Sequence, residues 1–161
     1  MLEMRQAVLV CGAAAALLVL AGCGGGGYAG YKFRPYTVRG VSYAPMAPAQ
    51  ALGFVEEGIA SWFDESRLWI FPGKSAIGER QWRWSRAAAH KTLPLPCKIR
   101  ITNLRNGRSC VVRVNDRGPF IAGRIVDVTP PVARQLGFYH QGLAPVRIEV
   151  LSVGDGPFRI R

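Results

Sequence analysis

Asp116 is the residue of this sequence best placed for acid–base chemistry. It follows the valine-rich stretch 111–114 and precedes the turn sequence Arg117-Gly118-Pro119, so it stands where a strand ends. Strand ends hold side chains rigidly, and a carboxyl group with a raised pKa can give and take a proton near neutral pH. The same position also suits an Asp that caps the turn or pairs with Arg113 or Arg117, and such pairing would lower its pKa.

Other side chains have the chemistry of a polar ligand site. His90 can orient a carboxylate or bind a hydroxyl group, although a lone His beside an apolar segment is more often a core residue with satisfied nitrogens. The flat rings of Trp69, Trp82 and Trp84 can stack on the apolar faces of sugars. Core packing is an equally good interpretation of any one of these rings.

The elements that would position these residues are mostly strands. Apolar alternation and β-branched residues predict five of them, at 57–63, 98–102, 111–114, 124–128 and 145–151. Asn106-Gly107 favours a two-residue hairpin turn, because both residues can adopt positive φ. This turn would place Cys110 opposite Asn103.

Helices are a minor part of the expected fold. Thr129 followed by two prolines predicts a helix start, and Gly137 predicts its end after residues 132–136. A second short helix is expected at 85–90. Many short strands with one or two helices indicate a closed β-barrel, which leaves no strand edge exposed.

The composition limits the class of protein. The chain has 161 residues and a formal net charge of +11, with 19 Gly and 11 Pro. Its length excludes two large domains, and its composition excludes a collagen, a coiled coil and a helical membrane bundle. We expect one barrel domain at 54–153 and a C-terminal tail at 154–161.

The N-terminus reads as an export signal followed by a spacer. Residues 1–22 have a charged start, a short apolar run and small residues, as in a signal peptide. The sequence Leu20-Ala21-Gly22-Cys23 resembles the bacterial lipoprotein box, in which the cysteine carries lipid; an ordinary secretory signal is the alternative. Residues 23–53, rich in Gly, Pro and Tyr, are then expected to form a disordered tether, with or without transient contacts by its tyrosines.

Cysteine and histidine content argues against a metal site. Cys97 and Cys110 remain after Cys11 and Cys23 are assigned to the signal and the lipid, and the exported location permits a disulfide between them. The predicted hairpin does not place them opposite each other, so both states stay open. Two histidines and the lack of a CxxC or HExxH pattern predict no metal and no other cofactor.

Three segments resemble the rare lipoprotein A family. They are AAHKTLPLP at 88–96, RITNL with NGRS at 100–109, and RVNDRGPF at 113–120, and the likeness continues through GRIVD at 123–127. The resemblance covers about residues 58–151. It implies a six-stranded double-psi β-barrel and an endolytic lytic transglycosylase that cuts peptidoglycan glycan strands, preferably those without peptides, at cell wall remodelling and septation.

The resemblance also implies roles for individual residues. Asp116 would be the acid/base, and Glu79, which lies eleven residues before His90 as the family pattern requires, would be a second catalytic candidate with His90 the third. Substrate binding is expected from Asn115 and Arg117 and, through ring stacking on sugars and not through the resemblance, from Trp82 and Trp84. We expect Asp116, Glu79 and His90 to converge in one open groove.

Departures from the family pattern leave a second function open. The family usually carries Asp where this chain has Trp82, and Asn where it has Ile77. The loss of an acidic group favours, as an alternative, a non-catalytic, expansin-like barrel that binds peptidoglycan without cutting it.

The expected partners follow from the family resemblance, the export signal and the charge. They are peptidoglycan strands, proteins of the division machinery, and a membrane that the protein reaches through lipid on Cys23. The outer membrane is preferred, and the protein would face the periplasm. A basic exported protein suits an anionic cell wall rather than nucleic acid, and the chain is expected to be a monomer.

Overall fold

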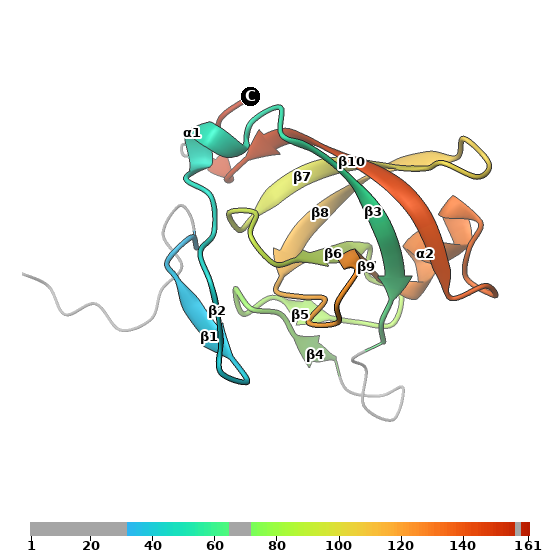
Figure 1. Ribbon diagram of the computed structural model, residues 1–161, viewed down its shortest axis with the longest axis horizontal. Coiled ribbons are helices and arrows are strands. Elements are labelled where there is room, and N and C mark those ends of the chain that lie inside the picture. The colour runs from blue at the N-terminus through green and yellow to red at the C-terminus, as the bar shows by residue number, and fades with distance from the viewer. Residues whose placement is uncertain (1–31, 65–71, 157–158) are drawn as a thin grey trace, which may run out of the picture.

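A closed six-stranded β-barrel forms the body of the molecule. The computed structural model describes residues 32–64, 72–156 and 159–161. Around the barrel the strands follow the order β10-β3-β9-β6-β8-β7 (Figure 1). The pairs β3–β9 and β6–β8 are parallel and the other pairs are antiparallel. This architecture confirms the predicted double-psi β-barrel.

The barrel strands are close to those predicted. They are β3 (Val55–Trp62), β6 (Ala87–His90), β7 (Cys97–Asn103), β8 (Ser109–Asp116), β9 (Arg124–Val128) and β10 (Leu143–Val153). Outside the barrel lie β1 (Tyr36–Val38), β2 (Val41–Tyr43), β4 (Gly73–Lys74), β5 (Arg80–Gln81) and the helices α1 (Pro48–Ala51) and α2 (Pro130–Leu136). Neither helix in the described ranges is long and apolar enough to span a membrane.

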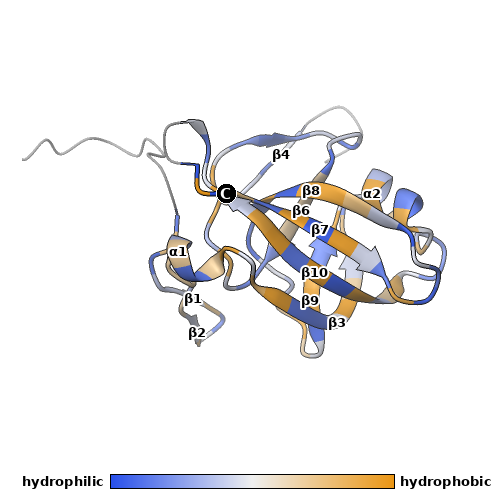
Figure 2. Cartoon of the chain, turned by 90° about the horizontal axis from the view of Figure 1, so that it is seen from above, coloured by the Kyte–Doolittle hydropathy of each residue, from blue (hydrophilic) through white to orange (hydrophobic). Residues whose placement is uncertain are grey.

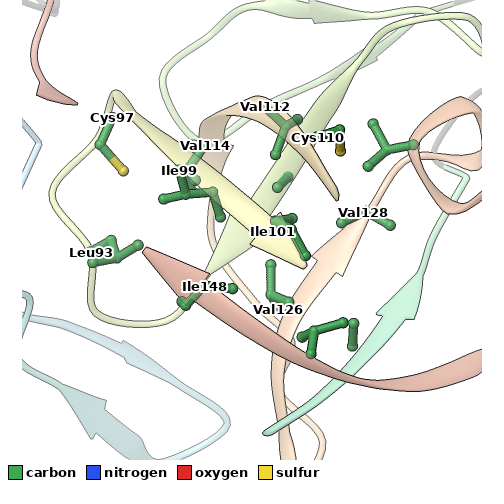
Figure 3. Close-up of a cluster of buried hydrophobic side chains, with 14 of the residues drawn as sticks. Leu93, Cys97, Ile99, Ile101, Cys110, Val112, Val114, Val126, Val128 and Ile148 are labelled. Atoms are coloured by element: carbon green, nitrogen blue, oxygen red, sulfur yellow. The ribbon is translucent and has the colours of Figure 1, made fainter. Parts of the chain in front are cut away.

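Period-two alternation builds the core. Along β10, Val146, Ile148 and Val150 are buried, whereas Arg147 between them is exposed, and Figure 2 shows the same alternation of hydropathy along this strand. Side chains from β7, β8, β9 and β10 meet inside the barrel (Figure 3). Each fully buried aliphatic side chain contributes about 1.5–3 kcal/mol of transfer free energy, so this interior is the main source of stability.

Two local predictions are wrong. Residues 87–90 form the strand β6 and are not part of a helix. The prediction failed because all four side chains are buried, and a fully buried run shows no periodicity that separates a strand from a helix. The hairpin turn is also longer than two residues, since Thr102 pairs with Ser109. The side-chain Nδ2 atoms of Asn103 and Asn106 both donate to the backbone carbonyl of Leu136. These two hydrogen bonds fix the longer loop against α2.

The hairpin register separates the two cysteines. Cys110 lies opposite Ile101, and Cys97 lies opposite Val114. Within the described part of the chain both thiols are free and buried. Burial raises the pKa of Cys97 to about 12, so this thiol stays protonated and unreactive at neutral pH.

The predicted tether is ordered over residues 32–53, which we call the strap; residues 1–31, with the signal and Cys23, lie outside the described residues. The strap contains β1, β2 and α1. Lys32 and Leu95 exchange two backbone hydrogen bonds, and Met46 N–H donates to the carbonyl of Thr92 at 2.8 Å. Ala51 is fully buried. Composition concealed this order because the strap, apart from its own short β1–β2 hairpin, gains its partners from the barrel.

Arg117 joins the strap to the barrel. One terminal nitrogen of its guanidinium group donates to the carbonyl of Leu93 at 2.5 Å, and the other donates to the carbonyl of Lys32 at 2.8 Å. The guanidinium also lies 5.2 Å from the ring centre of Tyr36, whose hydroxyl donates to the carbonyl of Lys91. A planar group with several donors suits such a junction better than the point charge of Lys.

We therefore expect Arg117→Met to release the strap without unfolding the barrel. The carbonyls of Leu93 and Lys32 would lose a charged donor, and the free energy of unfolding should fall by about 2–4 kcal/mol. Hydrogen exchange should become faster in residues 32–53. Arg147→Met is the matched control, because the ion pair of Arg147 with Glu57 is exposed. Unchanged exchange in the strap would contradict this role.

Candidate active site

A β-bulge aims Asp116 away from the core. Ala88 pairs with Val114, but the next residue of β6, Ala89, pairs with Asp116, so Asn115 is an extra residue in β8. Without the bulge, the period of two would place Asp116 on the same face as the buried Val114. The extra residue reverses the face that follows it, and the Asp116 side chain instead lines a surface pocket.

Asp116 is buried but well supplied with donors. Its side chain and backbone together are 8% exposed. Oδ1 accepts the backbone N–H groups of Ala76 at 2.9 Å and Arg117 at 2.7 Å, and Oδ2 accepts Gln81 Nε2 at 3.4 Å. Burial raises the pKa of Asp116 and the two backbone donors partly oppose that rise. A carboxyl group with this balance of burial and donors is suited to giving and taking a proton.

Glu79 reaches Asp116 only through other side chains. It accepts Asn115 Nδ2 at 2.7 Å, while Asn115 Oδ1 accepts Gln81 Nε2 at 3.2 Å, and Gln81 also contacts Asp116. Glu79 itself is held by Arg113 at 2.6 Å, which also binds Asp155. Asn115, predicted to bind substrate, is therefore occupied by this network. Glu79 lies near the site but is not among the residues that line the pocket.

His90 is the last residue of β6, and its side chain lies on the face of that strand opposite to the pocket. It is 2% exposed, its Nδ1 accepts the N–H groups of Thr92 and Leu93, and its Nε2 lies 3.1 Å from a carboxylate oxygen of Glu56. Because Nδ1 accepts, Nε2 carries the hydrogen. Burial lowers the pKa of His90. The structure does not bring His90 into the pocket, so the expected convergence of three residues is wrong in this respect.

Asp127 is the pocket residue that the sequence reasoning missed. The pocket is lined by Phe63, Ala89, Asp116, Arg117, Gly118, Pro119, Phe120 and Asp127. On β9, Val126 and Val128 point into the core (Figure 3), which leaves Asp127 on the opposite face. The sequence did contain a signal for this residue, because Asp127 stands between two valines of a predicted strand and therefore on the face opposite to theirs.

Asp127 is supported by β3 and by its own strand. Its Oδ1 accepts the hydroxyl of Ser61, and that hydroxyl oxygen accepts a guanidinium N–H of Arg124 at 3.3 Å. Burial raises the pKa of Asp127, and the hydrogen bond from Ser61 opposes the rise. The pocket thus holds two carboxyl groups whose pKa values are both raised by desolvation.

The remaining predicted residues differ in how far they are available. Arg117 lines the pocket, but its guanidinium is engaged by backbone carbonyls. Trp82 and Trp84 stack with ring centres 5.2 Å apart and planes inclined by 8°. Trp84 is 67% exposed, so it offers an open aromatic face, whereas Trp69 lies outside the described residues.

In the described part of the chain, no group of His, Cys, Asp or Glu could hold a metal ion.

The closed barrel with its carboxyl-lined pocket places the chain among the double-psi β-barrel proteins. A family described as "Lytic transglycolase" matches residues 55–148, and the chain belongs to this family. Its resemblance to the rare lipoprotein A proteins is confirmed by curated relatives.

Two of these relatives are named endolytic peptidoglycan transglycosylase RlpA. The protein from Pseudomonas aeruginosa is 46% identical over 119 residues, which are 73% of this chain and 33% of the relative. The protein from Vibrio cholerae is 44% identical over 138 residues, 83% of this chain and 50% of the relative. The chain thus spans half or less of the length of these relatives. Among solved structures, the Streptomyces papain inhibitor shares the fold with a TM-score of 0.50 at 17% identity, covering 62% of this chain and 96% of the inhibitor.

Proposed function

We propose that this chain is an endolytic peptidoglycan lytic transglycosylase. It would cleave the bond between N-acetylmuramic acid and N-acetylglucosamine in glycan strands, preferably those without peptides, and leave 1,6-anhydro ends on the muramic acid. The supporting observation is Asp116, a desolvated carboxyl group at the edge of an open pocket, in a chain whose relatives carry that name. We assign the activity to cell wall remodelling and septation.

The reaction requires two proton transfers and no attack by water. An acid protonates the oxygen that leaves, and the C6 hydroxyl of the muramic acid closes onto C1 as a base takes its proton. Asp116 is the group we assign to this proton transfer. Burial raises the pKa of Asp116, which strengthens this carboxylate as a base and makes its neutral form easier to reach.

Glu79 and His90 then act as positioning residues. Glu79 fixes the amide of Asn115, which fixes Gln81 beside Asp116. His90 orders the turn that follows it through the N–H groups of Thr92 and Leu93. The carbonyls of that turn bind Arg117, the neighbour of Asp116 in the chain. Glu79 thus holds side chains beside Asp116 and His90 holds a backbone turn, and in this assignment neither touches substrate.

Asp116→Asn is expected to reduce cleavage of peptide-free glycan strands by at least about 100-fold, because the amide cannot exchange the proton. Mass spectrometry of the products should show anhydro ends from the unchanged chain alone. Glu149→Gln is the matched control, since its exposed ion pair with Arg100 lies on the outer face of the barrel. If the unchanged chain binds strands but yields no anhydro ends, the function is that of a non-catalytic, expansin-like barrel.

We assign Trp82 and Trp84 to a stacking platform for sugar rings. Trp84→Ala should weaken binding to glycan strands by up to about 10-fold, because one aromatic stacking contact is worth about 0.5–1.5 kcal/mol. The free energy of unfolding should change by less than about 0.5 kcal/mol, since Trp84 is exposed. Leu104→Ala, at another exposed apolar residue, is the control in a pelleting assay with insoluble peptidoglycan. If Trp84→Ala and Leu104→Ala bind insoluble peptidoglycan equally well, the proposed stacking platform is wrong.

We further propose that lipid on Cys23 anchors the chain to the outer membrane, where it faces the periplasm as a monomer and meets proteins of the division machinery. The net charge of +11 would hold it near the anionic wall. Cys23→Ser should move the chain from the membrane fraction to the soluble fraction and abolish labelling by a fatty-acid analogue. Unchanged fractionation and labelling would contradict the anchor.

A further inference from the structure

Two carboxyl groups face the pocket from opposite sides of one strand. Ala89 of β6 pairs with Asp116 on β8 and with Asp127 on β9. Neighbouring strands lie about 4.8 Å apart, so the two aspartates are about two strand spacings apart at the same level of the sheet. Ala89 and both aspartates line the pocket. The small side chain of Ala89 leaves the space between the carboxyl groups open to a substrate.

The two carboxyl groups have different hydrogen-bond environments. Asp116 accepts two backbone N–H groups and the amide of Gln81, and such donors favour the carboxylate over the neutral acid. Asp127 accepts the hydroxyl of Ser61, and the described residues provide it with no further donor. Both pKa values are raised by burial, so the group with fewer donors retains its proton more readily.

We propose that Asp127 is a second catalytic residue, the acid that protonates the leaving oxygen, while Asp116 is the base that takes the proton of the C6 hydroxyl. This division of roles rests on the proposed function.

The proposed step balances without any other reactant. The bond between C1 and the bridging oxygen breaks with its electron pair on that oxygen, which takes the proton of Asp127. The C6 oxygen forms the new bond to C1, and its proton passes to Asp116. After release, Asp116 gives a proton to solvent water and Asp127 takes one from it, which restores the starting state.

Charged groups around the pair set the pH response. Arg117 and Lys32 act on Asp116, and Arg124 and Lys91 act on Asp127; uncharged Gln81 and Ser61 complete the two environments. The rate should fall at low pH as Asp116 is protonated and at high pH as Asp127 is ionised, which gives a bell-shaped profile.

Leaving-group chemistry separates the acid from the base. Asp127→Asn should lose about 100- to 10,000-fold of its rate on peptide-free strands, whose leaving sugar hydroxyl needs a proton. On a muramic acid glycoside with an acidic phenol as leaving group, it should stay within about 10-fold of the unchanged chain, because that phenolate needs no acid. Asp116→Asn should be impaired on both substrates, and Glu149→Gln on neither.

Folding is checked in the same variants. Because burial raises the pKa of Asp127, its ionisation opposes folding at neutral pH, and the stability it contributes is present at low pH and lost as the pH rises through its pKa. Asp127→Asn should therefore unfold at a temperature at least as high as the unchanged chain at pH 7, and lose that advantage in acid. Should it fail to fold, Ser61→Ala offers the second test. The loss of a donor to Asp127 should move the alkaline limb of the rate profile upward and leave the acidic limb in place.

The outcomes distinguish the two proposals. If the unchanged chain forms no anhydro ends, the proposed function fails. If the unchanged chain is active and Asp127→Asn stays within about fivefold of it on natural strands, Asp127 is not the acid. Equal impairment of Asp127→Asn on both substrates, or an alkaline limb unmoved in Ser61→Ala, would likewise overturn the assignment.

Discussion

The extra residue in β8 is the constraint on which the site depends. Asn115 occupies a bulge between Val114, which belongs to the core, and Asp116, which belongs to the pocket. Its amide is held from both sides, by Glu79 and by Gln81, so the bulge cannot relax into regular pairing without breaking a buried hydrogen bond. Barrel closure fixes β6 between β8 and β9, and the bulge then decides that Asp116 faces the pocket that Asp127 also lines, instead of the core.

Desolvation and hydrogen bonding act on the pocket carboxyl groups in opposite directions. Burial raises the pKa of both Asp116 and Asp127, and donors lower it. Two buried carboxyl groups reduce the stability of a fold, because burial penalises the ionised form of each of them. A site of this kind is expected where stability is exchanged for reactivity. The aliphatic interior of the barrel supplies the stability that this arrangement requires.

The strap shows how a site can be supported by residues outside its domain. Arg117 follows Asp116 in the chain and binds carbonyls from both the strap and the turn after β6. Tyr36 and Tyr43 of the strap pack against Phe120 at the rim of the pocket. The matched family region begins at residue 55, so these contacts come from a part of the chain that precedes it.

Alternation along the chain was enough to predict most of the barrel strands, because a strand with one buried face repeats every two residues whatever its neighbours are. The motif around Asp116 was likewise visible in the sequence, as were the residues that carry the family resemblance. β6 was missed because all four of its side chains are buried, and a run without a polar face has no period to read. The order of residues 32–53 was missed because their partners are residues such as Leu95 and Thr92, which lie far away along the chain.

The sequence by itself determined the alternation that fills the barrel and the chemistry of the side chains at 79, 90 and 116. Only the tertiary structure decided which of them share a pocket. A bulge is one unpaired residue, and nothing local marks Asn115 as that residue, because pairing depends on a strand 25 or more residues away. The same long-range pairing placed Asp127 and Asp116 on either side of Ala89 in one pocket and turned His90 toward Glu56. The face that a side chain occupies in a closed sheet is set by its neighbouring strands, and those are chosen by the whole fold.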